Sequence, residues 1–255
     1  MRTWQVDEGK FLSEAEVNRV TGFLKQRSSS ALSSLPKGNH ASGNGSKARP
    51  NDRSVGRVPV NDWLVIDLAL STGLRVSEIA NLRCGDIWVD DLPELTDGQA
   101  GGRASLIVRN GKNGKQRIVK FGAAFKEHLR EYLEWKKKNG EGCGPESPLI
   151  LSSNTRGLSR GRSPRGKMTT RALQKAFERN AKRAGIQARP NDCSVGRGHS
   201  IHSLRHTYAT FLLRASGNLR LVQKQLGHSS ITTTEVYADV LNPELDRALA
   251  KLYKF

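Results

Sequence analysis

The chain has 255 residues, with 42 Lys and Arg against 24 Asp and Glu, so its formal net charge at pH 7 is +18 and its pI is near 10.3. This charge favours a polyanionic partner, for which nucleic acid is the natural candidate. No apolar run approaches the roughly 18 residues of a membrane-spanning helix, so no membrane span is predicted. Cys84, Cys143 and Cys193 are widely spaced and form no CxxC pair, so neither a disulfide framework nor a zinc knuckle is suggested.

The first predicted element is a helix within residues 1–27. Ser13 precedes two acidic residues, as an N-cap does, and apolar residues from Val17 to Leu24 recur at helical spacing. Residues 28–59 are instead rich in Ser, Gly, Asn and Pro, with scattered Lys and Arg. Because such a segment buries too little apolar area to offset its ordering entropy, we predict a flexible basic insertion there.

Residues 60–240 are predicted to form one domain that is mainly α-helical and carries a small antiparallel β-sheet. Two short runs rich in β-branched residues cover 106–109 and 117–121, and two Asn-Gly dipeptides lie between them. This pattern predicts a β-hairpin. Helical patterns cover a segment that begins near Val76 and residues 62–70, 123–138, 169–184, 203–215 and 218–226. In the tail, residues 241–255, leucines at helical spacing predict one further amphipathic helix.

The corner before Val76 carries the first candidate site residue. Thr72-Gly73 breaks the helical pattern, and Arg75 follows almost directly. A lone Arg at a helix start is usually a solvated charge. Here it stands between apolar helices, where it would be partly desolvated, and Glu78 is placed three residues on to form an ion pair with it.

The predicted hairpin tip, GKNGK, is similar to a nucleotide-binding loop but lacks its spacing. Gln116 follows Lys115 where Ser or Thr is needed, and Arg109 stands in place of the first Gly, which excludes a nucleotide site. The lysines of a hairpin tip are most simply solvated. A turn of this kind would also let Lys112 swing toward DNA when it binds.

A strongly basic stretch lies between residues 155 and 189, with eleven Lys or Arg and one acid, Glu178. This density indicates a surface that faces DNA, where such contacts position the duplex and make binding strongly salt-dependent. The residues that we predict to contact DNA, here and on the hairpin, are Lys115, Arg117, Arg160, Arg162, Arg165, Lys167 and Arg171.

The stretch HSLRHTYATFLLRAS predicts a helix with an apolar face, and His202 and Arg205 lie near its start. The exposed amides and the positive dipole end of a helix favour an anion there. The spacing of His202 and His206 suggests a zinc site, but the Glu of an HExxH motif is absent and no further ligand cluster is apparent, so we predict no metal.

Two further candidates follow in the sequence. His228 comes directly after Gly227, so it is displayed at the end of the helix at 218–226 rather than on a core face. A helix C-terminus raises the affinity of a histidine for protons, which suits a donor to a phosphoryl oxygen. Tyr237 lies nine residues later, in a segment opened by the capping-box pattern of residues 232–235; a lone Tyr in a helix is usually a core residue.

Polar residues of these kinds suffice to cut a phosphodiester. Two arginines hold the oxyanion, lysine and histidines move protons, and a tyrosine attacks phosphorus to give a covalent protein–DNA ester. Because one phosphoester replaces another of similar energy, the chemistry needs no ATP, metal or other cofactor. The candidate catalytic residues are Arg75, Lys112, His202, Arg205, His228 and Tyr237.

Four motifs, TGLRVSEI, RNGKNGKQRIV, HSLRH and LGHSS, together with the tyrosine that follows, resemble the catalytic domain of tyrosine recombinases, the phage integrase family that includes the Xer proteins. The resemblance covers about residues 11–27 and 60–245. It implies a site-specific DNA recombinase, of the kind found on mobile elements, that works through a 3′-phosphotyrosine. It also assigns Arg75 to the scissile phosphate and Lys112, rather than Lys115, to catalysis.

The resemblance also sets expectations about partners. Most family members carry a helical core-binding domain before the catalytic one; we expect none here, as in the fimbrial switch invertases, because the first helix already starts near residue 12. The expected partners are double-stranded DNA and further copies of the chain, assembled as a dimer or tetramer through residues 241–255. An accessory protein is a further possible partner. We expect a cytoplasmic, nucleoid-associated protein and no membrane partner.

Two alternative functions stay open. A type IB topoisomerase shares this chemistry but rejoins the original strands, so relaxation of supercoils without partner exchange would favour it. A DNA-binding paralogue that has lost cleavage would bind DNA without reacting.

A near-perfect repeat, ARPNDRSVGR at 48–57 and ARPNDCSVGR at 188–197, differs only at Arg53 and Cys193. Two short copies are too few for a solenoid. Our hypothesis is that a short duplication in the coding DNA left similar basic turns in two loops. If the two copies adopt unlike backbone conformations, a shared structural role is excluded.

Overall fold

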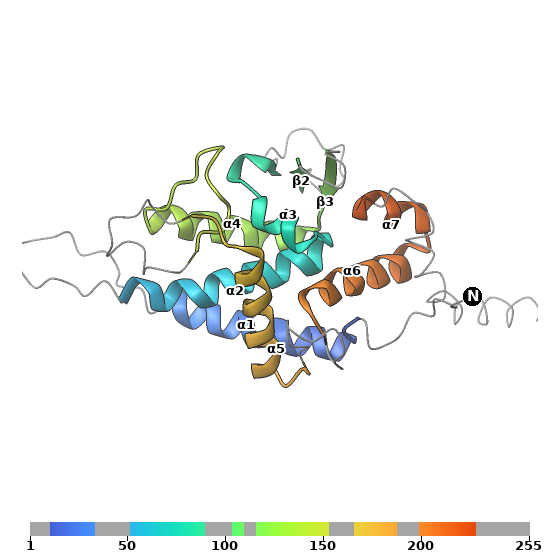
Figure 1. Ribbon diagram of the computed structural model, residues 1–255, viewed down its shortest axis with the longest axis horizontal. Coiled ribbons are helices and arrows are strands. Elements are labelled where there is room, and N and C mark those ends of the chain that lie inside the picture. Colours follow the sequence, from blue (N-terminus) through green and yellow to red (C-terminus); the bar gives the residue numbers. More distant parts are fainter. Residues whose placement is uncertain are drawn as a thin grey trace, which may run out of the picture.

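The computed structural model describes residues 11–33, 52–89, 104–109, 116–152, 166–187 and 199–227, of which 52–56 are described by their backbone alone. The elements shown in Figure 1 are α1 (Glu14–Ser33), α2 (Asp52–Thr72), α3 (Val76–Asn81), the 3-10 turn η2 (Cys84–Asp86), β1 (Ile87–Val89), β2 (Ala104–Val108), β3 (Arg117–Lys120), α4 (Ala123–Lys138), α5 (Thr170–Arg183), α6 (Ile201–Ser216) and α7 (Leu219–Leu226). The prediction of a mainly α-helical fold with a small antiparallel sheet is confirmed.

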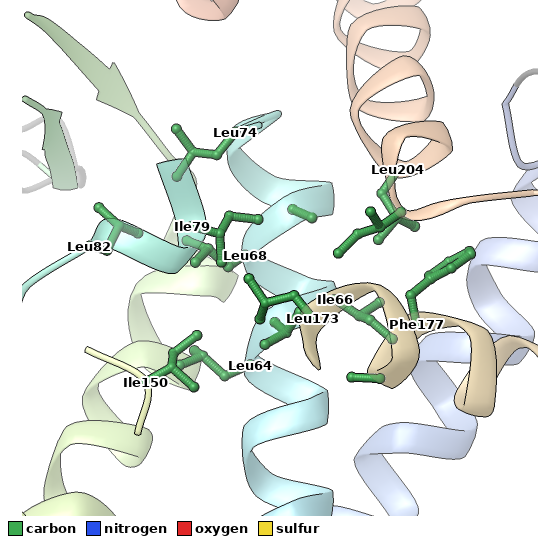
Figure 2. Packing of buried hydrophobic residues seen from close by; sticks show 14 of the residues in the cluster. Leu64, Ile66, Leu68, Leu74, Ile79, Leu82, Ile150, Leu173, Phe177 and Leu204 are labelled. Atoms are coloured by element: carbon green, nitrogen blue, oxygen red, sulfur yellow. The ribbon is translucent and has the colours of Figure 1, made fainter. Parts of the chain in front are cut away.

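Helix α2 is the centre of the core. Its apolar residues do not form a single stripe, and a helix that is apolar on most sides must be buried on most sides. Accordingly, α2 contacts α1, α4, α5 and α6. Figure 2 shows how buried side chains of α2 meet those of α5 and α6, with Leu64, Ile66, Leu68, Leu173, Phe177 and Leu204 labelled.

The sheet has the order β1-β2-β3 and is antiparallel throughout. Leu106 of β2 pairs with Val119 of β3, and both are almost completely buried. Because side chains alternate between the two faces of a strand, Arg117 lies on the same inward face as Val119, whereas Ile118 between them is 54% exposed. This register decides where the Arg117 guanidinium goes.

Helices α6 and α7 form a hairpin with a small apolar cluster of its own, made of Ala209, Leu213, Val222 and Leu226. Gly217 ends α6 in the left-handed conformation, with φ of 60°, and the Asn218 side chain then caps α7 by accepting a hydrogen bond from the backbone N–H of Leu221. Helix α7 also contacts β3. The end of α7 is thereby held against the sheet.

Both ends of the segment predicted as a flexible insertion, residues 28–59, are helical instead. Helix α1 continues to Ser33 and α2 already begins at Asp52. The two helices pack along each other, and this burial outweighs the weak helical preference of the sequence; Pro59 lies inside α2. Residues 34–51 lie outside the described part of the chain.

The repeat hypothesis is affected by the same helix. The first copy, 48–57, enters α2, so its second half is helical and not the basic turn that we predicted. The second copy, 188–197, lies outside the described residues. Among the described helices, none is long and apolar enough to cross a membrane.

Candidate active site

Three of the six candidate catalytic residues, Arg75, His202 and Arg205, lie in the described part of the chain. The other three, Lys112, His228 and Tyr237, lie outside it, so the roles predicted for them stay predictions. Of the predicted DNA contacts, Arg117, Lys167 and Arg171 are described, whereas those outside the described residues are Lys115, Arg160, Arg162 and Arg165.

The corner between α2 and α3 presents Arg75. Gly73 turns the chain with φ of 62°, a left-handed value that favours glycine, and Arg75 then opens α3 in an extended conformation. Its backbone N–H donates to Oε2 of Glu78 at 2.8 Å, and its guanidinium donates to Oε1 at 3.1 Å. The ion pair expected from the sequence is therefore present, and it orients an arginine side chain that is 29% exposed.

Arg205 connects this corner to the end of α7. Its guanidinium donates to the carbonyl oxygen of Gly73 at 2.5 Å and to that of Leu226 at 2.8 Å. Both carbonyls lie at helix ends, where the last C=O groups have no partner in their own helix. The buried guanidinium of Arg205 satisfies both carbonyls, and the negative dipole ends of α2 and α7 stabilise its positive charge.

His202 lies in the first turn of α6, one turn before Arg205. The His202 side chain is exposed at the surface, but the protein atoms around its ring shield it in part from water, and this together with the positive charges of Arg205 and Arg75 lowers its pKa below the usual 6.5. Arg205 lies one turn further along α6, and its hydrogen bond to the carbonyl of Gly73 ties this helix to the corner that carries Arg75, so residues from two distant motifs share one site. A histidine with a lowered pKa is neutral at pH 7 and able to accept a proton.

Arg117 differs from its prediction as a DNA contact. Its guanidinium donates to both carboxylate oxygens of Glu78, at 2.8 and 2.9 Å, and its Nε donates to the carbonyl oxygen of Gln225 at 3.2 Å. The side chain is only 12% exposed. The physical reason is the alternation along β3, which turns Arg117 inward together with Val119.

Glu78 is thus a site residue whose full role sequence reasoning missed. It was expected to pair with Arg75, but it also binds Arg117, 39 residues away. Burial raises the pKa of Glu78, yet the hydrogen bonds and charge of Arg117, the Arg75 N–H and the charge of Arg205 outweigh that effect and leave the pKa below 4.5. The carboxylate is therefore ionised at neutral pH.

Lys167 and Arg171 are exposed on the surface near α3. The Lys167 ammonium donates to Oδ1 of Asn81, the last residue of α3, at 2.5 Å. Arg171 lies in the first turn of α5. Both side chains remain accessible to a polyanion, as the prediction of DNA contacts for them requires.

The proton affinity of His202 gives a direct test of this geometry. We predict that the His202 imidazole titrates below pH 6.5 and that Arg75→Gln moves the midpoint upward, because one of the cations that disfavours the imidazolium is removed. The neutral form exists above the midpoint, so the acid limb of any reaction that uses His202 as a base also lies below pH 6.5.

The measurement is an NMR titration of the imidazole Cε1–H, with the His202 signal assigned by its loss in His202→Gln. Arg214→Gln, on the exposed side of the same helix, is the matched control and is expected to leave the midpoint unchanged. A midpoint above 6.5, or one that does not respond to Arg75→Gln, would contradict the shared site.

Comparisons with known proteins identify the family of this chain. A family model described as the phage integrase family matches residues 51–243. Tyrosine recombinase XerA of Thermococcus kodakarensis is 30% identical over 190 residues, which cover 74% of this chain and 55% of the relative. Tyrosine recombinase XerD of Corynebacterium glutamicum is 31% identical over 193 residues, which cover 76% of this chain and 53% of the relative. The chain therefore spans about half the length of these relatives.

Among solved structures, the XerH site-specific recombinase bound to palindromic difH substrate, in a post-cleavage complex, aligns with a TM-score of 0.61 and 20% identity, over 96% of this chain and 53% of that one. This likeness shows that the fold is shared. Since the family model covers most of the chain, the protein belongs to the phage integrase family.

Proposed function

We propose that this chain is the catalytic domain of a site-specific DNA recombinase that cleaves and rejoins DNA strands through a 3′-phosphotyrosine intermediate. The meeting of Arg75, His202 and Arg205 at one place carries the proposal. Family membership supports it, and relatives of the chain carry the name tyrosine recombinase. The net charge of +18 supports double-stranded DNA as the substrate.

In this mechanism the arginines bind the scissile phosphate. Arg75 and Arg205 donate hydrogen bonds to the non-bridging oxygens and stabilise the charge that builds on them during in-line transfer. A phenol with a pKa of about 10 is a weak nucleophile at neutral pH, so the Tyr237 hydroxyl needs a base. Neutral His202 accepts its proton as the phenolic oxygen bonds to phosphorus.

The leaving group needs a proton donor, whereas the nucleophile needs a proton acceptor. The 5′ oxygen departs poorly as an alkoxide, so Lys112 gives it a proton and a free 5′ hydroxyl results. His228 donates a hydrogen bond to a phosphoryl oxygen. Attack by a 5′ hydroxyl on the phosphotyrosine reverses every step, and a hydroxyl from a different strand gives a recombinant. The exposed Lys167 and Arg171 would hold the duplex by its backbone phosphates.

The assembly and location of the protein are also part of the proposal. We infer that residues 241–255 dock on a neighbouring copy and so couple assembly on DNA to the placement of Tyr237. A chromosomal substrate puts the protein in the cytoplasm at the nucleoid. The remaining basic residues of 155–189, among them Arg160, Arg162 and Arg165, would extend the duplex-binding face.

The test uses nicked duplexes with a randomised core, in which cleavage releases a short 5′-hydroxyl fragment and traps the covalent ester. The full-length chain should give a protein–DNA band that resists denaturation, and Tyr237→Phe should give none, because phenylalanine has no oxygen to bond to phosphorus. Sequencing the trapped duplexes identifies the target.

The alternatives predict other outcomes. A topoisomerase relaxes supercoiled plasmid with no exchange between labelled partner duplexes, and a non-cleaving paralogue binds DNA but gives no covalent band with the wild-type chain. An equal band from wild type and Tyr237→Phe would reject the assignment of the nucleophile.

A further inference from the structure

We propose that Arg117 is a positioning residue for strand transfer: it fixes the end of α7 and the hairpin strand β3 against Glu78, and it leaves the Arg75 guanidinium for the phosphate. The inference rests on the proposed function for the reaction that it affects. It assigns to Arg117 a role inside the site in place of the contact with DNA that its charge first suggests.

The contacts of Arg117 reach two separate elements. From β3, its two terminal nitrogens bind Glu78 at the start of α3, and its Nε binds the carbonyl of Gln225 in the last turn of α7. A guanidinium presents its donors in a rigid planar fork, so these bonds fix the relative placement of the three elements. In the sequence, Lys112 precedes Arg117 by five residues and His228 follows Gly227 directly. The Arg117 side chain thus fixes the ends of β3 and α7, which lie close in sequence to Lys112 and His228.

The end of α7 is shaped around this side chain. A Cβ atom added to Gly227 would lie 2.6 Å from Cδ and 2.9 Å from Nε of Arg117, closer than non-bonded atoms approach. Gly227 also has φ of 65°, so it serves as the C-cap of α7 and as the space through which Arg117 passes. The close fit indicates that the path of Arg117 is specified.

The second part of the proposal concerns charge. The Glu78 side chain is 3% exposed and binds two arginines, but not equally. Arg117 holds both oxygens with short bidentate bonds, whereas the Arg75 guanidinium makes one bond of 3.1 Å and is the more exposed of the two. Bidentate pairs are the stronger ones. Arg117 therefore neutralises Glu78, and the Arg75 guanidinium keeps donors that can turn to an incoming phosphate.

Removal of Arg117 should consequently harm the reaction more than DNA binding. With methionine at this position, Glu78 would draw Arg75 into the bidentate pair and away from the phosphate, and α7 would lose its tie to β3. We expect Arg117→Met to lower the single-turnover cleavage rate at saturating DNA by about 100-fold, the size of effect expected from a 1 Å misplacement. Arg117→Lys keeps the charge without the fork and should lie between wild type and Arg117→Met.

The salt dependence of binding separates this role from a phosphate contact. It is measured with full-length chain in the Tyr237→Phe background, so it does not depend on cleavage. We expect Arg117→Met to leave the Kd within about threefold and the slope of log K against log salt unchanged, whereas loss of a phosphate contact would reduce the slope by about 1. A reduced slope would overturn the proposal even if the wild-type chain cleaves no substrate.

A double variant tests the charge argument and guards against a folding defect. Breaking a buried ion pair leaves an uncompensated charge, which Glu78→Gln removes. We expect Arg117→Met with Glu78→Gln to cleave at least about tenfold faster than Arg117→Met alone, with both compared well below their melting temperatures. A double variant as slow as the single one would overturn the release of Arg75. Arg130→Met is the matched control and should cleave like wild type, because Arg130 is a partly exposed arginine on α4 whose carboxylate partner, Glu127, lies on the same helix. If the wild-type chain itself gives no covalent band, the proposed function is rejected. The salt dependence of DNA binding would then still test whether Arg117 contacts phosphate.

Discussion

Arg205→Ala is expected to slow strand cleavage by about 100- to 1000-fold and to destabilise the fold at the same time. In the reaction it removes a donor to the phosphoryl oxygens, which costs roughly 10²–10³ in rate for one oxyanion contact. In the fold it removes the two hydrogen bonds that join Gly73 and Leu226. Each bond from a charged donor is worth about 1.5–3 kcal/mol, so we expect a loss of about 3 kcal/mol in the free energy of unfolding.

Urea denaturation and single-turnover cleavage, measured on the same preparations, separate the two effects. Arg205→Lys keeps the charge, but an ammonium cannot hold two carbonyls with a planar fork, so we expect it to regain part of the stability and little of the rate. Arg214→Ala, exposed on the same helix, should change stability by less than about 1 kcal/mol and leave cleavage unaltered. Wild-type cleavage by well-folded Arg205→Ala would contradict the assignment of this residue to the phosphate.

The amphipathic helices could be predicted closely from the sequence. The pattern predicted a helix at 123–138, and α4 spans Ala123–Lys138. The predictions at 169–184, 203–215 and 218–226 differ from α5, α6 and α7 by at most two residues at either end. These helices carry their signals locally, in an apolar face of period 3.6 and in caps such as Asn218.

The ends of the predicted insertion could not be found in this way. Serines at positions 28–30 and the segment before Pro59 have weak helical preference, and composition alone indicated a flexible chain. Their helical state depends on the packing of α1 against α2, where Ser28 and Val60 are almost fully buried. Such burial is a tertiary effect, and it overrides local propensity.

In the site, too, the features with a local sequence signal could be predicted, and those that depend on tertiary contacts could not. Short motifs located Arg75, His202 and Arg205, because each lies at a helix start or corner that the pattern marks. The pairing of Arg117 with Glu78 depends on the register of β3 and on a contact between residues 39 apart. A period-2 reading of RIVK, with Val119 inward, would have turned Arg117 inward as well, and this was the signal available.

Gly73→Ala is the second substitution with a large expected effect, because two costs add at one position. With φ of 62°, alanine there adopts a conformation that costs about 1–2 kcal/mol. Its Cβ would also lie 2.3 Å from Cδ1 of Tyr208 and 2.8 Å from Cδ2 of Leu226, and overpacking of this kind costs about 1–3 kcal/mol more. We expect a loss of about 2–5 kcal/mol in the free energy of unfolding, measured by urea denaturation.

Gly217→Ala is the matched control, because Gly217 has nearly the same φ, 60°, but nothing within 4 Å of an added Cβ. It should lose only the conformational cost, about 1–2 kcal/mol, and keep cleavage. Equal losses at the two positions would mean that Tyr208 and Leu226 move aside freely. The backbone at this corner is held in place, since the carbonyls of Gly73 and Leu226 both accept hydrogen bonds from Arg205. A backbone shift at Gly73 that relieves the clash therefore disturbs the hydrogen bond from Arg205, and cleavage by the folded fraction should fall with stability.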